Sequence, residues 1–364
     1  MKTTKFFQGL SAIALTALVA AGFSSCNQQQ DNPITDEAQE VMKYNQGRLI
    51  IKEVNFGGGF KTTANKSYSW CKGMILYNNG GSAVTVKNLA IGTVPPGNAH
   101  ANNGNYNEED KLVYENEDWI PMIYGIWYQP NELTVEPYSD VVIAVNGAID
   151  HTQLAPEAFD LSAPTVQAMY DPESPYVNAN AYPTPAEGIP ASNYWKAAVF
   201  GLGNAWAVSV MCPTLVLFQF PEGVDPKAYC ADAANAYYDG GKETAANYCV
   251  KIPRAWVIDG VDSYRLSYEA DSKKRLTSDI DAGYALYNSN KQYSAYRNVN
   301  QKVTESLKGN KDKLVYGYDQ AVEGTQDASG IDAAASLKNG AKIIYMDTNN
   351  STSDFHLRKG WSLK

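Results

Sequence analysis

The chain has 364 residues, enough for one large β domain or two ordinary domains. Its 28 Gly, 17 Pro and 25 Tyr indicate a turn-rich, aromatic β protein rather than a helical one. The formal net charge of −9 disfavours binding to nucleic acids or to anionic lipid surfaces.

The N-terminal residues 1–25 have the pattern of a bacterial export signal. Two lysines precede an apolar run, Leu10–Phe23, that is too short for a convincing transmembrane span. Small residues then lead into Cys26, an arrangement that resembles a lipobox, although Phe23 stands where that motif usually has leucine. We therefore expect Cys26 to carry the lipid that tethers the mature protein to a membrane.

A polar segment, residues 26–47, follows and contains few core-forming side chains, so it is predicted to be a flexible tether. Its acidic residues Asp31, Asp36 and Glu37 resemble the surface-export signal of Bacteroidetes lipoproteins. The sequence thus predicts an outer-membrane lipoprotein and favours exposure at the cell surface over an inward-facing position.

The remaining chain shows apolar, β-branched runs separated by turn residues, which predicts strands. Two long insertions, 92–138 and 147–194, are expected to fold as loops over one end of the domain, and a short helix is expected within 226–250. The pattern predicts an all-β sandwich with little helix. The expected strands lie in Arg48–Phe60, Trp70–Asn78, Ala83–Ile91, Ser139–Asn146, Trp195–Ser209, Thr214–Phe220, Ile252–Asp259 and Ala341–Met346.

Four cysteines remain after Cys26, and an even number in an exported chain permits two disulfides. Cys230–Cys249 is the first expected pair because it closes a short segment, and it leaves Cys71–Cys212. Four buried free thiols are the alternative. No CxxC spacing indicates a zinc or thioredoxin-like site.

Several segments, taken in order, resemble the lamin-tail fold, an immunoglobulin-like β sandwich, and more closely an uncharacterised family of Bacteroidetes exported lipoproteins. The resemblance spans 48–356 and implies one elaborated domain over 48–364, an envelope location and no established activity. One departure is Ile75, where the family has an acid, whereas Glu53 keeps the family-like acid of the first strand. The matching segments are Ile51–Val54, Gly73–Asn78, Val84–Ile91, Glu136–Ala144, Val257–Asp259, Asp347–Asn350 and Asp354–Phe355.

No catalytic signature is present in the sequence. The three histidines, His100, His151 and His356, are far apart, and neither a G-x-S-x-G elbow nor an HExxH motif occurs. We therefore predict a protein that is not an enzyme and that needs no cofactor.

One acidic cluster has the spacing of the start of a calcium loop. It consists of Asp347, Asn349, Ser351 and Asp354, but it lacks the mid-loop glycine and the final bidentate glutamate. Turn capping is the alternative role for these side chains.

An aromatic run within the first insertion is the strongest candidate for a binding surface. Trp119, Tyr124, Trp127 and Tyr128 are predicted to stack on a sugar or another flat ligand. The alternative is that these rings cover the end of the sandwich as part of the core.

The leading functional hypothesis is a non-enzymatic, membrane-anchored lipoprotein that binds a ligand or a partner protein, for example beside a TonB-dependent outer-membrane nutrient transporter. A structural or adhesion module of the cell surface is the second hypothesis. The third is an envelope hydrolase, which would need two carboxylates at roughly 5–9.5 Å in a cleft.

Overall fold

The structure is a computed structural model, and it describes residues 48–97, 99, 104–175, 181–202, 213–288 and 291–363. The predicted export signal, the tether, Cys26, His100 and Cys212 lie outside these residues. Within the described ranges, no helix has both the length and the apolar character needed to cross a membrane.

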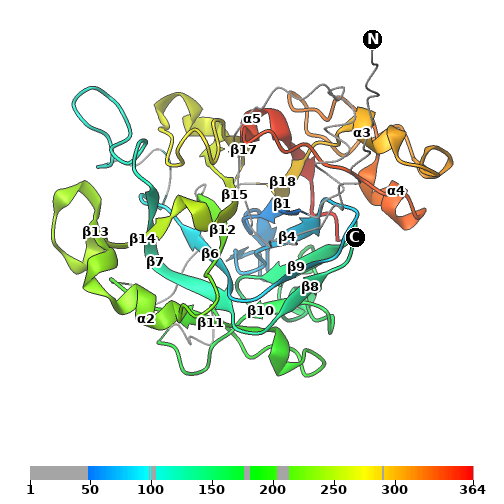
Figure 1. Cartoon of the computed structure of the whole chain (residues 1–364). Helices are drawn as coiled ribbons and strands as arrows, with labels where there is room; N and C mark the ends of the chain where they lie inside the picture. The colour runs from blue at the N-terminus through cyan, green and yellow to red at the C-terminus, as the bar shows by residue number, and fades with distance from the viewer. Residues whose placement is uncertain are drawn as a thin grey trace, which may run out of the picture.

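A single mixed sheet of 13 strands forms the body of the molecule (Figure 1). Its order is β15-β12-β6-β7-β11-β10-β9-β4-β1-β18-β19, and β14 pairs with β7 and with β13. The pairs β9–β10 and β10–β11 are parallel, whereas the other pairs are antiparallel. The strands are β1 (Leu49–Asn55), β4 (Gly73–Asn78), β6 (Leu89–Thr93), β7 (Trp119–Gln129), β9 (Asp140–Ala144), β10 (Gln167–Met169), β11 (Tyr194–Ala198), β12 (Leu215–Gln219), β13 (Ala236–Tyr238), β14 (Tyr248–Pro253), β15 (Val257–Val261), β18 (Tyr293–Arg297) and β19 (Phe355–Lys359).

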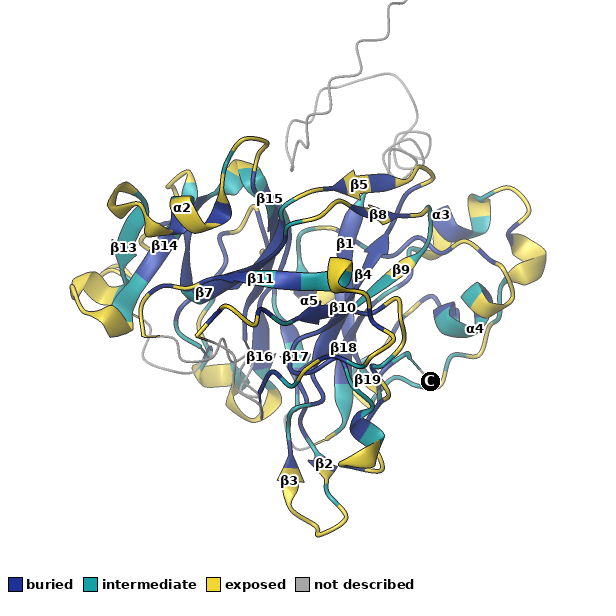
Figure 2. Ribbon diagram, turned by 90° about the horizontal axis from the view of Figure 1, so that it is seen from below, coloured by how far each residue is buried: buried dark blue, intermediate teal, exposed yellow. Residues whose placement is uncertain are grey.

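Three small two-stranded sheets and a few short helices surround this body. Figures 1 and 2 place α3 and α4 together at one end of the molecule, and α2 with β13 and β14 at the other end. The small sheets are β2–β3 (Phe60–Lys61, Ser67–Tyr68), β5–β8 (Val84–Val86, Leu133–Val135) and β16–β17 (Ser263–Arg265, Ala285–Tyr287). The α-helices are α2 (Pro226–Ala231), α3 (Gln301–Ser306), α4 (Ala333–Lys338) and α5 (Ser351–Asp354).

The first strand, β1, lies inside the sheet between β4 and β18. All seven of its residues, LIIKEVN, are buried, and these include the polar Lys52, Glu53 and Asn55 beside four apolar side chains. The strand is followed by Gly57, which has a φ of 76°. A Cβ atom there would lie 2.5 Å from Cγ of Lys72, so both the backbone angle and the close approach require glycine.

The core has apolar clusters on both faces of the sheet, and the central strands are accordingly buried in Figure 2. Along β7, Trp127 packs in one cluster, whereas its neighbours Ile126 and Tyr128 pack in the other. Because successive side chains of a strand point to opposite faces, the two clusters lie on either side of β7.

The sheet curls so that strands from distant positions meet. The backbone N–H of Ile51 on β1 donates to Oδ2 of Asp259 on β15 over 2.7 Å, although β15 ends one side of the strand order. The prediction of a mostly-β chain with little helix is confirmed. A sandwich of two separate sheets is not confirmed, since the strands form one curled mixed sheet that resembles half of a barrel.

The prediction that 92–138 is a loop insertion is wrong for residues 119–129, because they form β7, the longest strand among the described residues. Tyr124 and Gly125 have φ values of 69° and 107°. This break bends the strand, so its first half pairs with β14 and its second half pairs with β11. The expected strand Ala83–Ile91 is also divided, at Asn88 with a φ of 53°, into β5 and β6, which belong to different sheets.

The predicted last strand, 341–346, is also wrong, because only an isolated bridge at Tyr345 forms there. Side chains, rather than a neighbouring strand, accept hydrogen bonds from the backbone of this buried segment. Its N–H groups at Ile344 and Tyr345 donate to Oγ1 of Thr304 over 3.0 Å and to Oδ1 of Asn79 over 2.8 Å. The C-terminal strand is instead β19, which pairs with β18.

Candidate functional site

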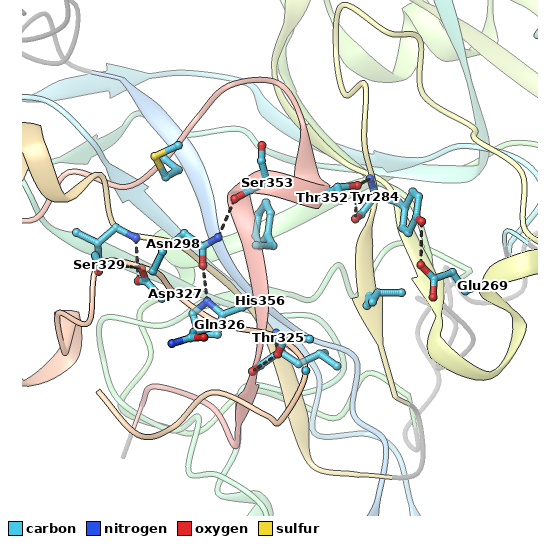
Figure 3. Close-up of a pocket in the computed structure, with 17 residues that line it drawn as sticks. Glu269, Tyr284, Asn298, Thr325, Gln326, Asp327, Ser329, Thr352, Ser353 and His356 are labelled. Atoms are coloured by element: carbon cyan, nitrogen blue, oxygen red, sulfur yellow. Dashed lines mark hydrogen bonds between the residues drawn. The ribbon is translucent and has the colours of Figure 1, made fainter. Parts of the chain in front are cut away.

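A cavity of about 460 Å³ lies beside β19 and is lined by both polar and apolar side chains. Its walls come from β19, from α5, from β17 and from the loop 324–329 (Figure 3). These segments are far apart in sequence and meet because β19 pairs with β18 and forms the last strand at one side of the sheet.

One wall contains His356 in a chain of hydrogen bonds. Its Nδ1 lies 2.7 Å from Oδ1 of Asn298, and its Nε2 lies 2.7 Å from the hydroxyl of Tyr318. The amide oxygen of Asn298 can only accept, so Nδ1 carries the proton and Nε2 accepts from Tyr318. Burial lowers the pKa of His356 to about 3, with a further contribution from the positive Arg358. The ring is therefore neutral at physiological pH and is held in one tautomer.

Asn298 is fixed by a second contact, since its Nδ2 donates to the carbonyl of Ser353 over 2.7 Å. Figure 3 shows Asn298 between Ser353 and His356. Asp327 stands on the same side of the cavity, where it accepts from the N–H of Val299 over 3.0 Å and from the N–H of Ser329 over 2.9 Å. Burial raises the pKa of Asp327 above its ordinary value.

The other wall is formed by Tyr284, Glu269 and Thr352 (Figure 3). The Tyr284 hydroxyl donates to Oε1 of Glu269 over 2.8 Å, which raises the pKa of that tyrosine. Its ring stacks on Tyr264 with the centroids 3.9 Å apart. Oγ1 of Thr352 accepts from the N–H of Tyr284 over 3.0 Å, so β17 and α5 are connected at this point.

The cavity thus combines amides, hydroxyls and carboxylates with apolar surface from Leu286, Met346 and Phe355. Gln326 lies on the exposed loop of the lining, where its amide can both donate and accept. A wall of this composition can bind the hydroxyl groups of a small polar ligand and cover its less polar faces.

The predicted metal cluster has a different role in the structure. Asp347 and Asp354 are buried beside Arg297, whose Nη1 lies 3.2 Å and 3.5 Å from their carboxylate oxygens. Asn349 donates to the carbonyl of Asp279, and Ser351 donates its N–H to Asp281. Within the described part of the chain, no group of three or more acidic, histidine or cysteine residues is arranged to hold a metal ion.

Arg297 is the centre of this buried group of charges. Its Nη2 also lies 2.6 Å from Oδ2 of Asp259, and Arg48 pairs with Asp347 over 2.6 Å. The surrounding carboxylates raise the pKa of Arg297. The two aspartates of the calcium-loop pattern, Asp347 and Asp354, are therefore paired with arginines. Through these pairs they connect the C-terminal segment to β1, β15 and β18.

The four aromatic residues predicted to bind a ligand all belong to β7, but they do not form one exposed surface. Trp127 is fully buried and Tyr128 is 6% exposed, on opposite faces of the strand, so the prediction is wrong for these two. Trp119 is half-buried and packs against Tyr237 with centroids 5.0 Å apart. Tyr124 is half-buried at the bend of the strand.

The predicted disulfide Cys230–Cys249 does not form, because both cysteines are free and buried. Cys230 packs with Val250 in one core cluster, and Cys249 precedes Val250 on β14, so its side chain points to the opposite face. The predicted pair Cys71–Cys212 includes a residue outside the described ranges, and Cys71 itself is buried.

Comparison with known proteins identifies the family. The family model described as "Protein of unknown function (DUF4876)" matches residues 136–360 of the chain. The chain belongs to the DUF4876 family. The matched DUF4876 region includes β9 to β19 and therefore every residue that lines the cavity, whereas β1 to β8 precede it.

A solved DUF4876 family protein, from Bacteroides thetaiotaomicron VPI-5482, is similar to the chain in fold. The TM-score is 0.59 at 19% sequence identity, and the match covers 87% of this chain and 72% of that chain. At this identity the likeness shows the fold alone. A search of curated proteins finds no match to this DUF4876 chain.

Sequence reasoning singled out His356 but not the residues that surround it. Asn298 and Asp327 were missed because they lie in polar segments with no motif. One local signal was present for Asp327, since Asp-x-Ser is typical of a turn in which the carboxylate accepts from the backbone N–H two residues later. That signal predicts a turn, however, and not a cavity.

Proposed function

We propose that this protein is a membrane-anchored lipoprotein that binds a small, neutral, hydroxylated ligand in the cavity between His356 and Tyr284 without transforming it. The single observation that carries the proposal is the lining of the cavity. Amide and hydroxyl groups converge there with a stacked tyrosine and apolar side chains, which is the usual composition of a site for a polar organic molecule.

Binding is favoured over hydrolysis because the groups that could act as acid or base already make hydrogen bonds to other protein groups. His356 has both ring nitrogens hydrogen-bonded and a pKa of about 3, so it is a weak base at neutral pH. Both carboxylate oxygens of Asp327 accept from the backbone. These contacts support a rigid, preorganised binding wall.

The proposed location rests on the N-terminal sequence. The export signal and the lipobox-like arrangement before Cys26 support a lipid anchor. The proposed role is capture of a nutrient at the cell surface, beside an outer-membrane transporter. The strand order β9-β4-β1 supports a distant relation to the lamin-tail fold, since three of the seven segments that resemble that fold lie side by side.

Binding is tested by calorimetry of the protein without its export signal, with a panel of neutral monosaccharides and disaccharides. We expect saturable binding of at least one sugar, weakened about tenfold by Gln326→Ala, since one hydrogen bond is lost without changing the fold. Gln301→Ala is the matched control, because Gln301 is exposed on α3, donates to Glu305 and does not line the cavity. Equal binding by both variants, or no sugar bound, would refute the site.

The anchor is tested separately by labelling cells with radioactive palmitate. The full chain is expected to carry the label and to sediment with membranes, whereas Cys26→Ala is expected to lose both properties. A Cys26→Ala protein that remains labelled would exclude this anchor, whatever the outcome of the sugar titrations.

A further inference from the structure

A second cavity, of about 570 Å³, lies where the start of β18 meets the end of β19. Tyr293 and Lys359 are paired across these strands, and Lys291, Arg358 and Trp361 contribute to the lining. None of these residues lines the cavity beside His356, so the two cavities are separate sites.

Three cations line this second cavity in a chain whose formal net charge is −9. Lys291, Arg358 and Lys359 have no carboxylate within 4.0 Å among the described residues. In contrast, the buried Arg275 and Arg297 are paired with aspartates. The positive charge at this cavity is therefore not neutralised by direct ion pairs.

The guanidinium group of Arg358 is held in place before any ligand arrives. Its Nη1 donates to the carbonyl of Gly360 over 2.9 Å, and its Cζ lies 5.7 Å from the ring centroid of Tyr296. A fixed guanidinium is well suited to an oxyanion because its planar donors match two oxygens and little side-chain entropy is lost on binding.

An unsatisfied donor lies in the same wall. Trp361 is 1% exposed, and its Nε1 has no hydrogen-bond partner within the described part of the chain. A buried N–H without an acceptor is costly, and structures with such a group usually provide its partner in another form, such as a ligand or a water molecule. This donor is an observation independent of the three cations.

The rest of the lining suits an organic molecule rather than a bare ion. Gln292 and Gln320 contribute amides, and half-buried Tyr293 contributes an aromatic surface. One carboxylate, Glu157, accepts a hydrogen bond from Gln292. The amides and rings can contact hydroxyl groups and a ring of the ligand, while the cations contact its negative group.

We propose that this cavity binds a small organic anion, with its carboxylate, sulfate or phosphate group between Lys291, Arg358 and Lys359 and its ring against Tyr293. The Nε1–H of Trp361 donates to an oxygen of the ligand.

The test titrates the protein without its export signal, by calorimetry, with D-glucuronate, glucose 6-sulfate and glucose 6-phosphate. Neutral glucose and inorganic sulfate are the comparison ligands. We expect saturable binding of at least one of the three organic anions, and affinity at least tenfold lower for glucose and for inorganic sulfate. Raised salt concentration should weaken the binding, because part of the attraction is between charges.

Two variants assign the binding to this cavity. Arg358→Gln is expected to weaken the anion about tenfold or more, since a charge-assisted hydrogen bond is lost. Trp361→Phe is expected to weaken it less, with its thermal unfolding measured to confirm folding. Lys87→Gln is the matched control, because Lys87 is exposed and lies outside the cavity.

Several outcomes would overturn the proposal. These are absence of saturable binding for all three organic anions, equal affinity for glucose that Gln326→Ala leaves unchanged, equal affinity for inorganic sulfate, or equal weakening by Lys87→Gln. The sugar cavity is distinguished by its own variant, because Gln326→Ala should leave the affinity for the anion unchanged. A failure at one cavity therefore leaves the result at the other interpretable.

Discussion

Glu53 on β1 accepts a hydrogen bond of 2.5 Å from the hydroxyl of Ser294 on β18, although the two residues are 241 positions apart in sequence. The same carboxylate accepts from the backbone N–H of Ser362 over 3.1 Å and from the Ser362 hydroxyl. Glu53 is fully buried, and burial raises its pKa. This side chain therefore connects the first strand, a late strand and the C-terminal segment.

Replacing Glu53 by alanine should lower the free energy of unfolding by about 3 kcal/mol. The change removes the acceptor of the Ser362 hydroxyl and of the Ser362 backbone N–H, and the Ser294 hydroxyl keeps the Gly360 carbonyl as its acceptor. Each donor left without an acceptor costs about 1–3 kcal/mol. Urea titration measures the loss. Glu132→Ala, at an exposed glutamate, should change stability by less than about 0.5 kcal/mol, and an equal effect of both substitutions would contradict the role of Glu53.

Arg297→Ala should be more damaging, with a loss of about 3–5 kcal/mol. It removes the arginine that Asp259, Asp347 and Asp354 share as an ion-pair partner, and it leaves these buried carboxylates without that positive charge. Arg48→Ala is the control, because the Arg48 side chain is 21% exposed and its pair with Asp347 should contribute about 1 kcal/mol. Chemical denaturation of the two variants tests this order of effects, and the reverse order would be inconsistent with it.

His356 should make stability depend on pH. Its pKa is about 3 in the folded protein against an ordinary value of 6.5, so the unfolded chain binds the proton more readily. The contribution of neutral His356 to the free energy of unfolding is therefore fully present above about pH 6.5. It decreases as the pH falls toward about 3, by at most about 1.4 kcal/mol per pH unit.

His356→Gln removes this contribution. The stability difference between the wild type and the variant should shrink as the pH is lowered from about 7 to about 4. Urea titrations at several pH values measure this difference, in which the contributions of all other groups cancel. Parallel pH curves for the two proteins would show that His356 does not titrate as the buried geometry requires.

The region 347–354 should not respond to calcium. Its two aspartates are paired with arginines, and an ion that does not bind the folded state cannot stabilise it. The melting temperature is therefore expected to change by less than about 1 °C when calcium or a chelator is added. A rise of several degrees with calcium that is abolished by Asp354→Asn would restore the metal site.

Cys230 and Cys249 should react slowly with a thiol reagent in the folded protein. Burial raises the pKa of Cys230 to about 12 and also raises the pKa of Cys249, so the reactive thiolate is scarce. The measurement uses a variant in which Cys26, Cys71 and Cys212 are replaced, and unfolding in urea should expose both thiols. Detection of a Cys230–Cys249 disulfide by mass spectrometry without reductant would contradict the free state.

The sequence predicted those parts of the fold that depend on local pattern. The runs in β1, β4 and β12 are continuous and apolar, so they were identified as strands. β7 was missed because Pro121 and Gly125 interrupt it and its aromatic residues suggested a binding loop. The segment 341–346 has a strand-like sequence, yet Asn79 and Thr304 supply its hydrogen bonds.

The candidate site was less predictable than the fold. Asn298, Asp327 and His356 meet only because β19 pairs with β18 and the loop 324–329 packs beside them. No spacing in the sequence indicates such a meeting. Similarly, the acidic residues near the C-terminus had the spacing of a calcium loop, but the position of Arg297 beside them depends on the tertiary fold.

The place of β1 between β4 and β18 has a consequence for the order of folding. During synthesis β4 emerges soon after β1, but the other edge of β1 has no partner until residue 293 has been made. Contacts of such long sequence separation give a high contact order and slow folding. An incomplete chain therefore exposes an apolar strand edge, which favours aggregation. We expect the nascent protein to depend on chaperones until its C-terminal third is complete.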